Sequence, residues 1–361
     1  MQTSYRVLGL MSGTSVDGLD LACADFLLKD GKWTFELLAA ESIDYEGRLR
    51  EQLKASINLP AEELLVFHNE YGQYLGESSA YFLNKHGLSV QFIASHGHTV
   101  FHQPERQLTF QLGYGQALAD SSGFEVVCDF RSTDILLGGE GAPLVPVGDQ
   151  MLFSDYDVCI NLGGISNCSF DQGGRRIAFD VCATNMLLNA LVNEIGLAFD
   201  ENGQLAAKGE LDTRLFQALN EIPYFLKEPP KSLGFEWFQD AVEPILGKHS
   251  ALNLASRLNT AVHHIAFQIK QALDKIPDHS RILLTGGGAR NKFLVSTIQE
   301  YFPNHEVIVP AVEIADFKEA IVFGFLGILR ARKEVNILSS VTGALHDSYG
   351  GVWYYPQKVK S

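Results

Sequence analysis

Two apolar runs enclose a polar turn in the segment Arg6-Val-Leu-Gly-Leu-Met-Ser-Gly-Thr-Ser-Val-Asp-Gly-Leu-Asp-Leu-Ala-Cys-Ala-Asp25. Residues 7–11 and 19–26 predict the two strands of a β-hairpin, and the turn between them is rich in glycine and hydroxyl groups. Glycine lets a ligand approach the backbone, hydroxyls can hold phosphate oxygens, and the Asp17 carboxylate can hold Mg²⁺. A solvated surface turn is the alternative interpretation of this segment.

The composition is that of an ordinary globular protein. The chain has 361 residues, of which 46% are hydrophobic and 20% charged, and this length favours two domains. The net charge of −15 disfavours nucleic acid as a partner, because a phosphate backbone requires a basic surface. The longest apolar segment, residues 320–329, has about half the length of a membrane span. The N-terminal apolar run is interrupted by polar residues, so we expect no signal peptide.

The five cysteines are scattered along the chain without metal-ligand or redox-motif spacing. They are Cys23, Cys128, Cys159, Cys168 and Cys182. Most of them lie in apolar runs that predict strands, so we expect reduced thiols in the core of a cytoplasmic protein.

The hairpin pattern occurs a second time. The first hairpin precedes a third strand at 33–42, and residues 157–170 predict another hairpin, with a third strand at 176–179. Because strands and helices alternate after each hairpin, we predict an α/β fold of two similar domains, residues 1–145 and 146–361. Ligands bind at the carboxyl ends of parallel strands, so we expect nucleotide and substrate in a cleft between the domains. The C-terminal helix and tail are expected to pack back on the first domain.

Three further motifs bear residues suited to chemistry. Gly286, Gly287 and Gly288 connect a buried strand to a helix, which is typical of a nucleotide-binding turn, although a tight strand–helix connection alone also requires glycine. Asp180 stands at the predicted end of strand 176–179 among apolar residues, where a raised pKa suits a general base. A helix N-cap is the alternative role for Asp180.

Two polar segments remain, one with three histidines and, further along the chain, one with the sequence Asp-Phe-Arg. His96, His98 and His102 suggest a metal site, but no carboxylate or cysteine stands at ligand spacing. We therefore interpret His96-Gly-His-Thr99 as a loop that contacts sugar or phosphate. Asp129 and Arg131 either bind an anionic group of the substrate or form a structural salt bridge.

Segments distributed over the whole chain resemble those of one family, the anhydro-N-acetylmuramic acid kinases. They are Gly-Leu-Met-Ser-Gly-Thr-Ser-Val-Asp-Gly-Leu-Asp20, Ser-His-Gly-His-Thr99, Asp-Phe-Arg131, Gly-Gly-Glu-Gly-Ala-Pro-Leu-Val-Pro146, Asn-Leu-Gly-Gly-Ile-Ser-Asn167, Pro-Pro-Lys-Ser232, Leu-Thr-Gly-Gly-Gly-Ala-Arg-Asn291, Lys-Glu-Ala320 and Val-Thr-Gly-Ala344. The resemblance implies two actin-like, ribonuclease H-like domains of the sugar kinase/Hsp70/actin superfamily. It also implies a reaction in which ATP and water convert 1,6-anhydro-N-acetylmuramic acid to N-acetylmuramic acid 6-phosphate during cell-wall recycling.

The resemblance also implies roles for individual residues. Asp180 matches the general base, and Glu319 matches a carboxylate near it. The residues implied in ATP binding are Gly13, Thr14, Ser15, Val16, Asp17, Gly18, Leu19, Asp20, Gly163, Gly164, Gly286, Gly287, Gly288 and Asn291. The residues implied in binding the amino sugar are His96, Thr99, Arg131 and Asn185. Asp17 is expected to hold Mg²⁺ through water, and a homodimer is a fold-level expectation.

The chain departs from the family pattern at two places. The family usually has Asp-Thr-Gly-Pro-Gly-Asn where this chain has Asp180-Val-Cys-Ala-Thr-Asn185, and Gln where this chain has His98. Because both glycines are replaced, we expect the turn beside Asp180 to differ from that of the family. The departures leave two alternatives open: a kinase for a different anhydro- or amino-sugar, and a non-catalytic protein that binds sugar or nucleotide.

Overall fold

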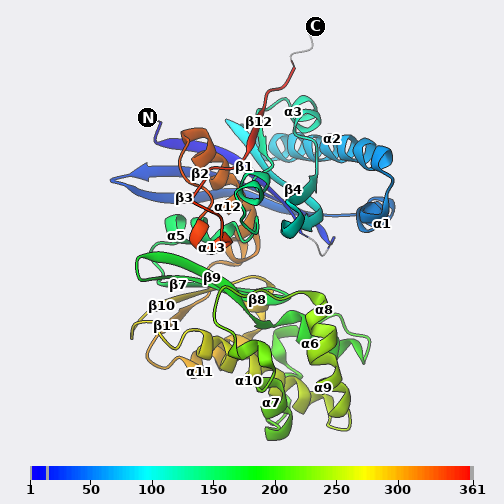
Figure 1. Ribbon diagram of the computed structural model, residues 1–361, viewed down its shortest axis with the longest axis vertical. Helices are drawn as coiled ribbons and strands as arrows, with labels where there is room; N and C mark the ends of the chain where they lie inside the picture. The colour runs from blue at the N-terminus through cyan, green and yellow to red at the C-terminus, as the bar shows by residue number, and fades with distance from the viewer. Residues whose placement is uncertain (1, 14–15, 358–361) are drawn as a thin grey trace. The chain divides into compact units, whose positions relative to one another are not determined.

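The computed structural model describes residues 2–13 and 16–357. The chain divides into two compact units, and the second is inserted in the first. One unit combines Met1–Leu152 with Phe317–Ser361, and the other is Phe153–Asp316. Each unit consists of a sheet with helices, as Figure 1 shows. The prediction of an α/β fold with two domains is therefore confirmed.

The first unit is built on a mixed sheet. In its described part, seven strands form one sheet in the order β12-β6-β4-β1-β2-β3, with β5 paired to β4. The strands are β1 (Ser4–Ser12), β2 (Gly18–Lys29), β3 (Lys32–Asp44), β4 (Phe92–Gln103), β5 (Leu108–Leu112), β6 (Val126–Cys128) and β12 (Val352–Tyr354). The helices are α1 (Gly47–Ala55), α2 (Ala61–His86), α3 (Gly115–Ser122), α4 (Ser132–Leu136), α5 (Val145–Leu152), α13 (Ser339–Thr342), most of α12 (Val312–Arg332) and the short turns η1 (Ser56–Asn58) and η2 (Pro104–Arg106).

The second unit repeats the central part of this topology. Within residues 153–316, five strands form a sheet in the order β11-β10-β7-β8-β9. The strands are β7 (Val158–Leu162), β8 (Ile165–Gln172), β9 (Arg175–Ala183), β10 (Arg281–Thr285) and β11 (Glu306–Ile308). The longer helices are α6 (Asn185–Asn193), α7 (Thr213–Asn220), α10 (Leu254–Ala272) and α11 (Lys292–Tyr301). Shorter turns are η3 (Glu201–Gly203), η4 (Ala206–Lys208), η5 (Pro223–Leu226), α8 (Phe235–Trp237), η6 (Phe238–Val242), α9 (Glu243–Lys248) and η7 (Gly287–Arg290).

The C-terminal part of the chain completes the first unit. Strand β12 pairs antiparallel with β6, and α12 packs directly on β1. A Cβ atom on Gly9 of β1 would lie 1.8 Å from the carbonyl oxygen of Ala320, so this close approach requires glycine. Contacts therefore place α5 and Phe317–Ser361 in the first unit, whereas the sequence analysis placed the division of the chain at residues 145/146.

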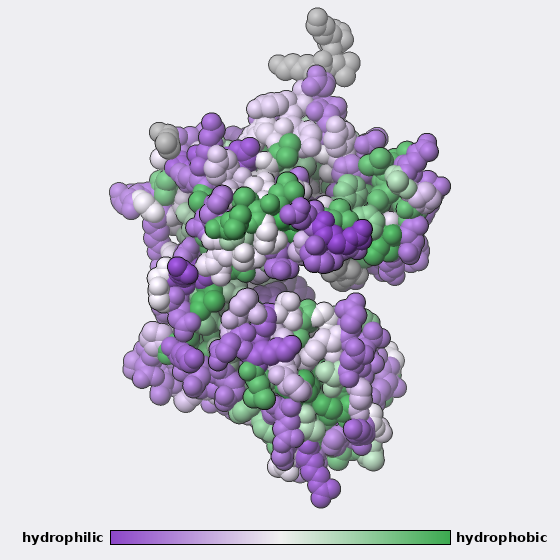
Figure 2. Space-filling view, in the orientation of Figure 1, coloured by the Kyte–Doolittle hydropathy of each residue, from purple (hydrophilic) through white to green (hydrophobic). Residues whose placement is uncertain are grey.

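The surface combines polar and apolar areas. On the face seen in Figure 2, hydrophilic residues are interspersed with smaller hydrophobic areas. Among the exposed apolar side chains, Leu226 is 87% and Leu345 is 83% exposed. None of the described helices combines the length and the apolar character that a bilayer crossing requires.

Two strands are longer than the sequence pattern predicted, and both corrections concern candidate site residues. We predicted a loop at His96-Gly-His-Thr99, but these residues lie within β4, which runs from Phe92 to Gln103. We predicted that Asp180 follows its strand, but β9 continues through Asp180 to Ala183. In both cases polar residues with low strand propensity stay in the ladder because their neighbours pair, as Asp180 does with Asn167.

Candidate active site

The tip of the first hairpin joins β1 to β2. Thr14 and Ser15 lie outside the described residues, so their expected contacts with ATP are not addressed by the structure. Val16 has a positive φ of 56°, and its N–H donates to the carbonyl of Gly13 at 3.2 Å. The carbonyl oxygen of Asp17 accepts from the Tyr45 N–H at 3.2 Å. The Asp17 side chain is exposed, so its carboxylate is open to a hydrated cation.

The other carboxylate of this hairpin, Asp20, is half-buried and accepts a hydrogen bond from the Ser42 hydroxyl on β3. Within residues 2–13 and 16–357, no group of three or more His, Cys, Asp or Glu side chains gathers at metal-binding distance. Mg²⁺ is commonly held by one or two carboxylates together with water and phosphate oxygens. The assignment of Asp17 to Mg²⁺ therefore stays a prediction.

Buried hydroxyl groups connect the hairpin to the first unit's core. The Tyr45 hydroxyl donates to Ser12 Oγ at 2.8 Å and lies 2.6 Å from the Tyr71 hydroxyl. Ser12 Oγ lies 3.3 Å from Nδ1 of His98. Burial lowers the pKa of His98, and a hydrogen bond to the Gly13 backbone opposes this shift. His98 therefore supports the start of the hairpin tip through Ser12 and the Gly13 backbone.

His96 and Arg131 form a fixed pair in the first unit. His96 Nδ1 lies 2.8 Å from the Gly97 carbonyl, and its Nε2 accepts from Arg131 Nε at 3.0 Å. Arg131 Nη1 also donates to the Gly141 carbonyl at 2.6 Å. Burial lowers the pKa of His96, so the ring is neutral and both of its nitrogens are engaged. The geometry makes His96 the residue that orients the Arg131 guanidinium.

Charged side chains of α12 lie near this pair. Burial lowers the pKa of Arg131 to about 10, while Glu319 and Asp134 oppose the shift. Burial raises the pKa of Glu319, which Lys318 and Arg131 oppose. Lys318 itself is buried and forms a 2.6 Å ion pair with Asp149. The sequence analysis singled out Arg131 and Glu319 and missed the pair of Lys318 with Asp149, for which the Lys-Glu-Ala320 motif was the available signal.

Thr99, the other candidate on β4, is half-buried and less firmly held. Gln111 Nε2 donates to its hydroxyl at 3.5 Å, which is at the limit of a hydrogen bond. The side chain is therefore available to a ligand.

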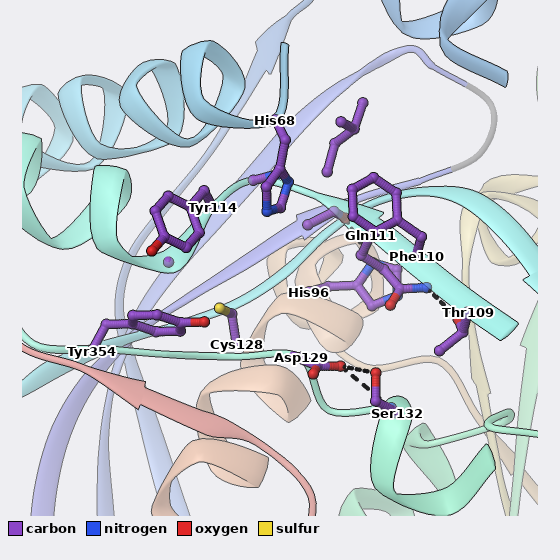
Figure 3. A pocket seen from close by; sticks show the side chains of 14 residues that line it. His68, His96, Thr109, Phe110, Gln111, Tyr114, Cys128, Asp129, Ser132 and Tyr354 are labelled. Atoms are coloured by element: carbon purple, nitrogen blue, oxygen red, sulfur yellow. Dashed lines mark hydrogen bonds between the residues drawn. The ribbon is translucent and has the colours of Figure 1, made fainter. Parts of the chain in front are cut away.

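A small pocket of about 140 Å³ opens beside His96. Figure 3 shows side chains around it that include His68 from α2, Tyr354 from β12 and Tyr114, which directly precedes α3. The Gly113 N–H donates to Nδ1 of His68 at 3.1 Å, so the neutral ring carries its proton on Nε2. Residues from segments this far apart form no linear motif, which is why the sequence analysis missed the pocket.

Asp180, in the second unit, is the candidate general base. Burial raises the pKa of its carboxyl group, and a hydrogen bond from the Leu233 N–H to Oδ2, at 2.9 Å, opposes this shift. Residues 181–183 continue β9 beyond Asp180, and Thr184 lies between the strand and α6. All four of these side chains are buried. None of residues 181–184 has a positive φ, so this segment has no backbone conformation that requires glycine.

The second hairpin and the triple-glycine turn lie side by side in the second unit. A Cβ atom on Gly286, which has a φ of 80°, would lie 2.3 Å from Asn161 Oδ1. A Cβ atom on Gly288 would lie 2.8 Å from Leu162 Cβ. Gly164, at the hairpin tip, is exposed. The structure therefore brings Gly163, Gly164, Gly286, Gly287 and Gly288 together in this unit. We call them the glycine-rich surface, although Gly288 itself is buried beneath it.

Two asparagines hold this glycine-rich surface together. Asn185 Nδ2 donates to the Leu162 carbonyl at 3.0 Å, and the Asn185 N–H donates to Gly163 at 3.1 Å. Asn291 caps α11, since its Oδ1 accepts from the Leu294 N–H at 3.0 Å. Asn185, which we expected at the sugar, therefore lies against the glycine turns that we expected at the nucleotide.

The family model described as anhydro-N-acetylmuramic acid kinase matches residues 5–356. An anhydro-N-acetylmuramic acid kinase of Synechococcus elongatus is 36% identical, over 94% of this chain and 96% of the relative. That of Chromobacterium violaceum is 35% identical, over 93% of this chain and 95% of the relative. Among solved structures, the activator of the 2-hydroxyisocaproyl-CoA dehydratase from Clostridium difficile matches with a TM-score of 0.42 and 15% identity, covering 93% of this chain and 98% of that chain. The family match extends over nearly the whole chain, and the chain belongs to the anhydro-N-acetylmuramic acid kinase family.

Proposed function

We propose that this chain opens 1,6-anhydro-N-acetylmuramic acid with water and phosphorylates its O6 with ATP. The products are N-acetylmuramic acid 6-phosphate and ADP, and the step belongs to cell-wall recycling. The observation that carries the proposal is the family match over residues 5–356. The half-buried carboxylate of Asp180, with one oxygen held by a backbone N–H, supports it.

In this proposal Asp180 is the general base. Its carboxylate takes a proton from water, the water oxygen forms a bond to the anomeric carbon, and the bond from that carbon to O6 breaks. O6 then receives the γ-phosphoryl group, which ATP supplies. A raised pKa suits this role, because a base is most effective when its pKa approaches the working pH.

The first unit supplies the proposed contacts with the sugar. Arg131, which stays cationic because its pKa remains near 10, suits an anionic group such as the substrate's carboxylate. His96 fixes its orientation, and Thr99 offers a hydroxyl. Glu319 is proposed as a second carboxylate at the sugar.

The glycine-rich surface of the second unit fits a nucleotide. Gly164 and Gly287 are exposed, so phosphates or ribose can approach their backbone closely. We assign the phosphates to these turns and to residues 13–20, and Mg²⁺ to Asp17 through water. When bound, the cation would offset negative charge on the phosphate oxygens.

A label from water tests the function. Protein, ATP and the anhydro sugar are incubated in H₂¹⁸O, and ADP and products are analysed by mass spectrometry. We expect ADP release that depends on the sugar, with ¹⁸O in the sugar product and none in its phosphate group. Turnover with other anhydro- or amino-sugars but not this one, or binding of both ligands without turnover, would overturn the proposal. Label in inorganic phosphate would identify ATP hydrolysis instead.

A reducing compartment is also part of the proposal. All five cysteines are free and buried, and burial raises the pKa of Cys128 to about 12 and that of Cys182 to about 11. Such thiols are inert core side chains, which are typical of cytoplasmic proteins. The homodimer stays a prediction.

A further inference from the structure

A segment outside the sheet covers the edge of β9 at Asp180. Strand β9 is the last strand in the sheet order, so one side of its backbone is open to other partners. The Asp180 N–H donates to the carbonyl of Lys231 at 3.2 Å. Two residues further along, the Leu233 N–H donates to Asp180 Oδ2 at 2.9 Å. The same segment therefore holds both the backbone and the carboxylate of Asp180.

Tyr224 makes a third contact with the same residue. Its hydroxyl donates to the Asp180 carbonyl at 2.7 Å. The side chain is only 5% exposed, and burial raises the pKa of the phenol, so it is a neutral donor. Both outward-facing backbone groups of Asp180 are thus bonded from outside the sheet.

Lys231 connects these contacts. Its Nζ lies 4.8 Å from the centroid of the Tyr224 ring and 5.6 Å from that of Phe179. Burial lowers the pKa of this amine. A partly desolvated ammonium over an aromatic face is attracted to the ring, so Lys231 ties its segment to Tyr224. We call Tyr224, Lys231 and Leu233 the Asp180 clamp.

The strand itself leaves the orientation of Asp180 weakly fixed. Asn167 pairs with Asp180 and Ser166 pairs with Cys182, so Val181 is an extra residue and β9 has a bulge there. Bulges interrupt the ladder and turn the neighbouring side chains. A carboxylate beside a bulge on an edge strand requires support from elsewhere.

We propose that Tyr224 and Lys231 are positioning residues, which hold Leu233 on Oδ2 of Asp180 and leave Oδ1 to accept the proton from water. This inference rests on the proposed role of Asp180 as general base. It adds two residues that touch neither reacting atom and act through Asp180.

The clamp also governs the protonation of Asp180. The titratable groups around it are Tyr224 from η5, Lys231, Cys182 on β9 and Cys168 on β8, whose pKa is raised by burial and by Asp180. The two thiols and the phenol are neutral near pH 7. The Leu233 N–H stabilises the charged carboxylate and so lowers its pKa. When the clamp loosens, this stabilisation is lost and the pKa of Asp180 rises.

Two substitutions test the clamp kinetically. We expect Tyr224→Phe to lower kcat on the order of tenfold, with the KM for ATP unchanged, because a small displacement of a catalytic group has a large effect on rate. The acid limb of the kcat/KM profile should move to higher pH. Lys231→Met should also move the acid limb to higher pH. Lys231→Arg, which keeps a cation, should leave the limb where it lies in the unmodified protein. Tyr301→Phe and Lys227→Met are matched controls, since Tyr301 bonds His263 at 3.5 Å and Lys227 is exposed. We expect neither control to move the limb.

A second measurement does not depend on turnover. The protein is labelled with ¹³C at the aspartate carboxyl carbons, and Asp180→Asn identifies the Asp180 signal. We expect this carboxyl to titrate at higher pH in Tyr224→Phe and Lys231→Met than in the unmodified protein. The proposed role of the clamp would be overturned if folded Lys231→Met showed an unchanged titration of Asp180 and an unchanged acid limb of kcat/KM. Absence of sugar-dependent ADP release in the unmodified protein would instead overturn the proposed function, while the titration still decides about the clamp. Circular dichroism shows whether Tyr224→Phe folds. If this variant does not fold, the test of the clamp rests on Lys231→Met.

Discussion

Each unit has a hairpin followed by a third strand, and in each an aspartate pairs across two of these strands. The two aspartates differ in which strand they lie on and in what holds their carboxylate. On β2 and β3 of the first unit, Asp20 pairs with Ser42. On β8 and β9 of the second unit, Asn167 pairs with Asp180. In the first pair the two side chains bond each other, because the serine hydroxyl donates to the carboxylate. In the second pair the carboxylate is held by Leu233, which lies outside the hairpin.

This difference indicates how one topology serves two roles. An acid bonded to its own cross-strand neighbour is held within the hairpin. An acid on an edge strand, bonded to a distant segment, can be tuned by that segment without a change in the sheet. We therefore expect the two acids to respond differently to the same substitution.

The largest expected effect is on the rate. Asp180→Asn should lower kcat by about 10²–10⁴-fold, because an amide cannot accept the proton from water. Asp20→Asn keeps an oxygen that accepts a hydrogen bond from Ser42. It should therefore lower kcat only on the order of tenfold. Steady-state ADP release measures both. Equal losses in the two variants would contradict the distinction between the acids.

The next effect is on the pH dependence. Burial raises the pKa of Asp180, and only the carboxylate accepts a proton, so kcat/KM should rise with pH through this raised pKa. The acid limb should therefore lie above about 3.9, the value of an unperturbed aspartate. Below the limb, activity should fall about tenfold per pH unit. A limb at the ordinary aspartate value would indicate a solvated carboxylate.

A smaller effect concerns the glycines of the second unit. Gly286→Ala should lower the free energy of unfolding by about 2–4 kcal/mol, because its backbone conformation suits only glycine and a Cβ would meet Asn161. Gly164→Ala, where a Cβ meets nothing closer than Met186 Cε at 4.0 Å, should change stability by less than about 1 kcal/mol. Urea unfolding measures both, and the KM for ATP should rise in Gly164→Ala. Similar losses of stability at the two positions would contradict the geometry.

The smallest effect is expected at Ser42. Ser42→Ala removes one exposed hydrogen bond to Asp20 and should cost about 0.5–1.5 kcal/mol of stability. The acid limb should stay in place, in contrast to the clamp variants. Thermal unfolding and the pH profile check this, and a shifted limb would contradict the distinction between the two acids.

The sequence predicted much of the fold because its signals are local. The buried strand and the helix that we expected on either side of the three glycines are β10 and α11. Their signal is local, since an apolar run, glycines and an N-capping Asn291 follow one another directly. The strands at His96 and Asp180 were predicted too short, because pairing with a distant neighbour decides whether a polar residue stays extended.

The candidate site was predicted only where a motif marks it. His96 and Arg131 were both singled out, but their mutual hydrogen bond depends on β4 and on the segment after β6. The Leu233 N–H on Asp180 left no signal in the sequence, because any residue except proline supplies it at that position.

The insertion of one unit within the other has a consequence for synthesis. The first sheet lacks β12 and the packing of α12 on β1 until the last residues of the chain are made. The whole of Phe153–Asp316 precedes them. On the ribosome the second unit is therefore the first that can fold completely. The core of the first unit stays incomplete until residues 317–354 are made.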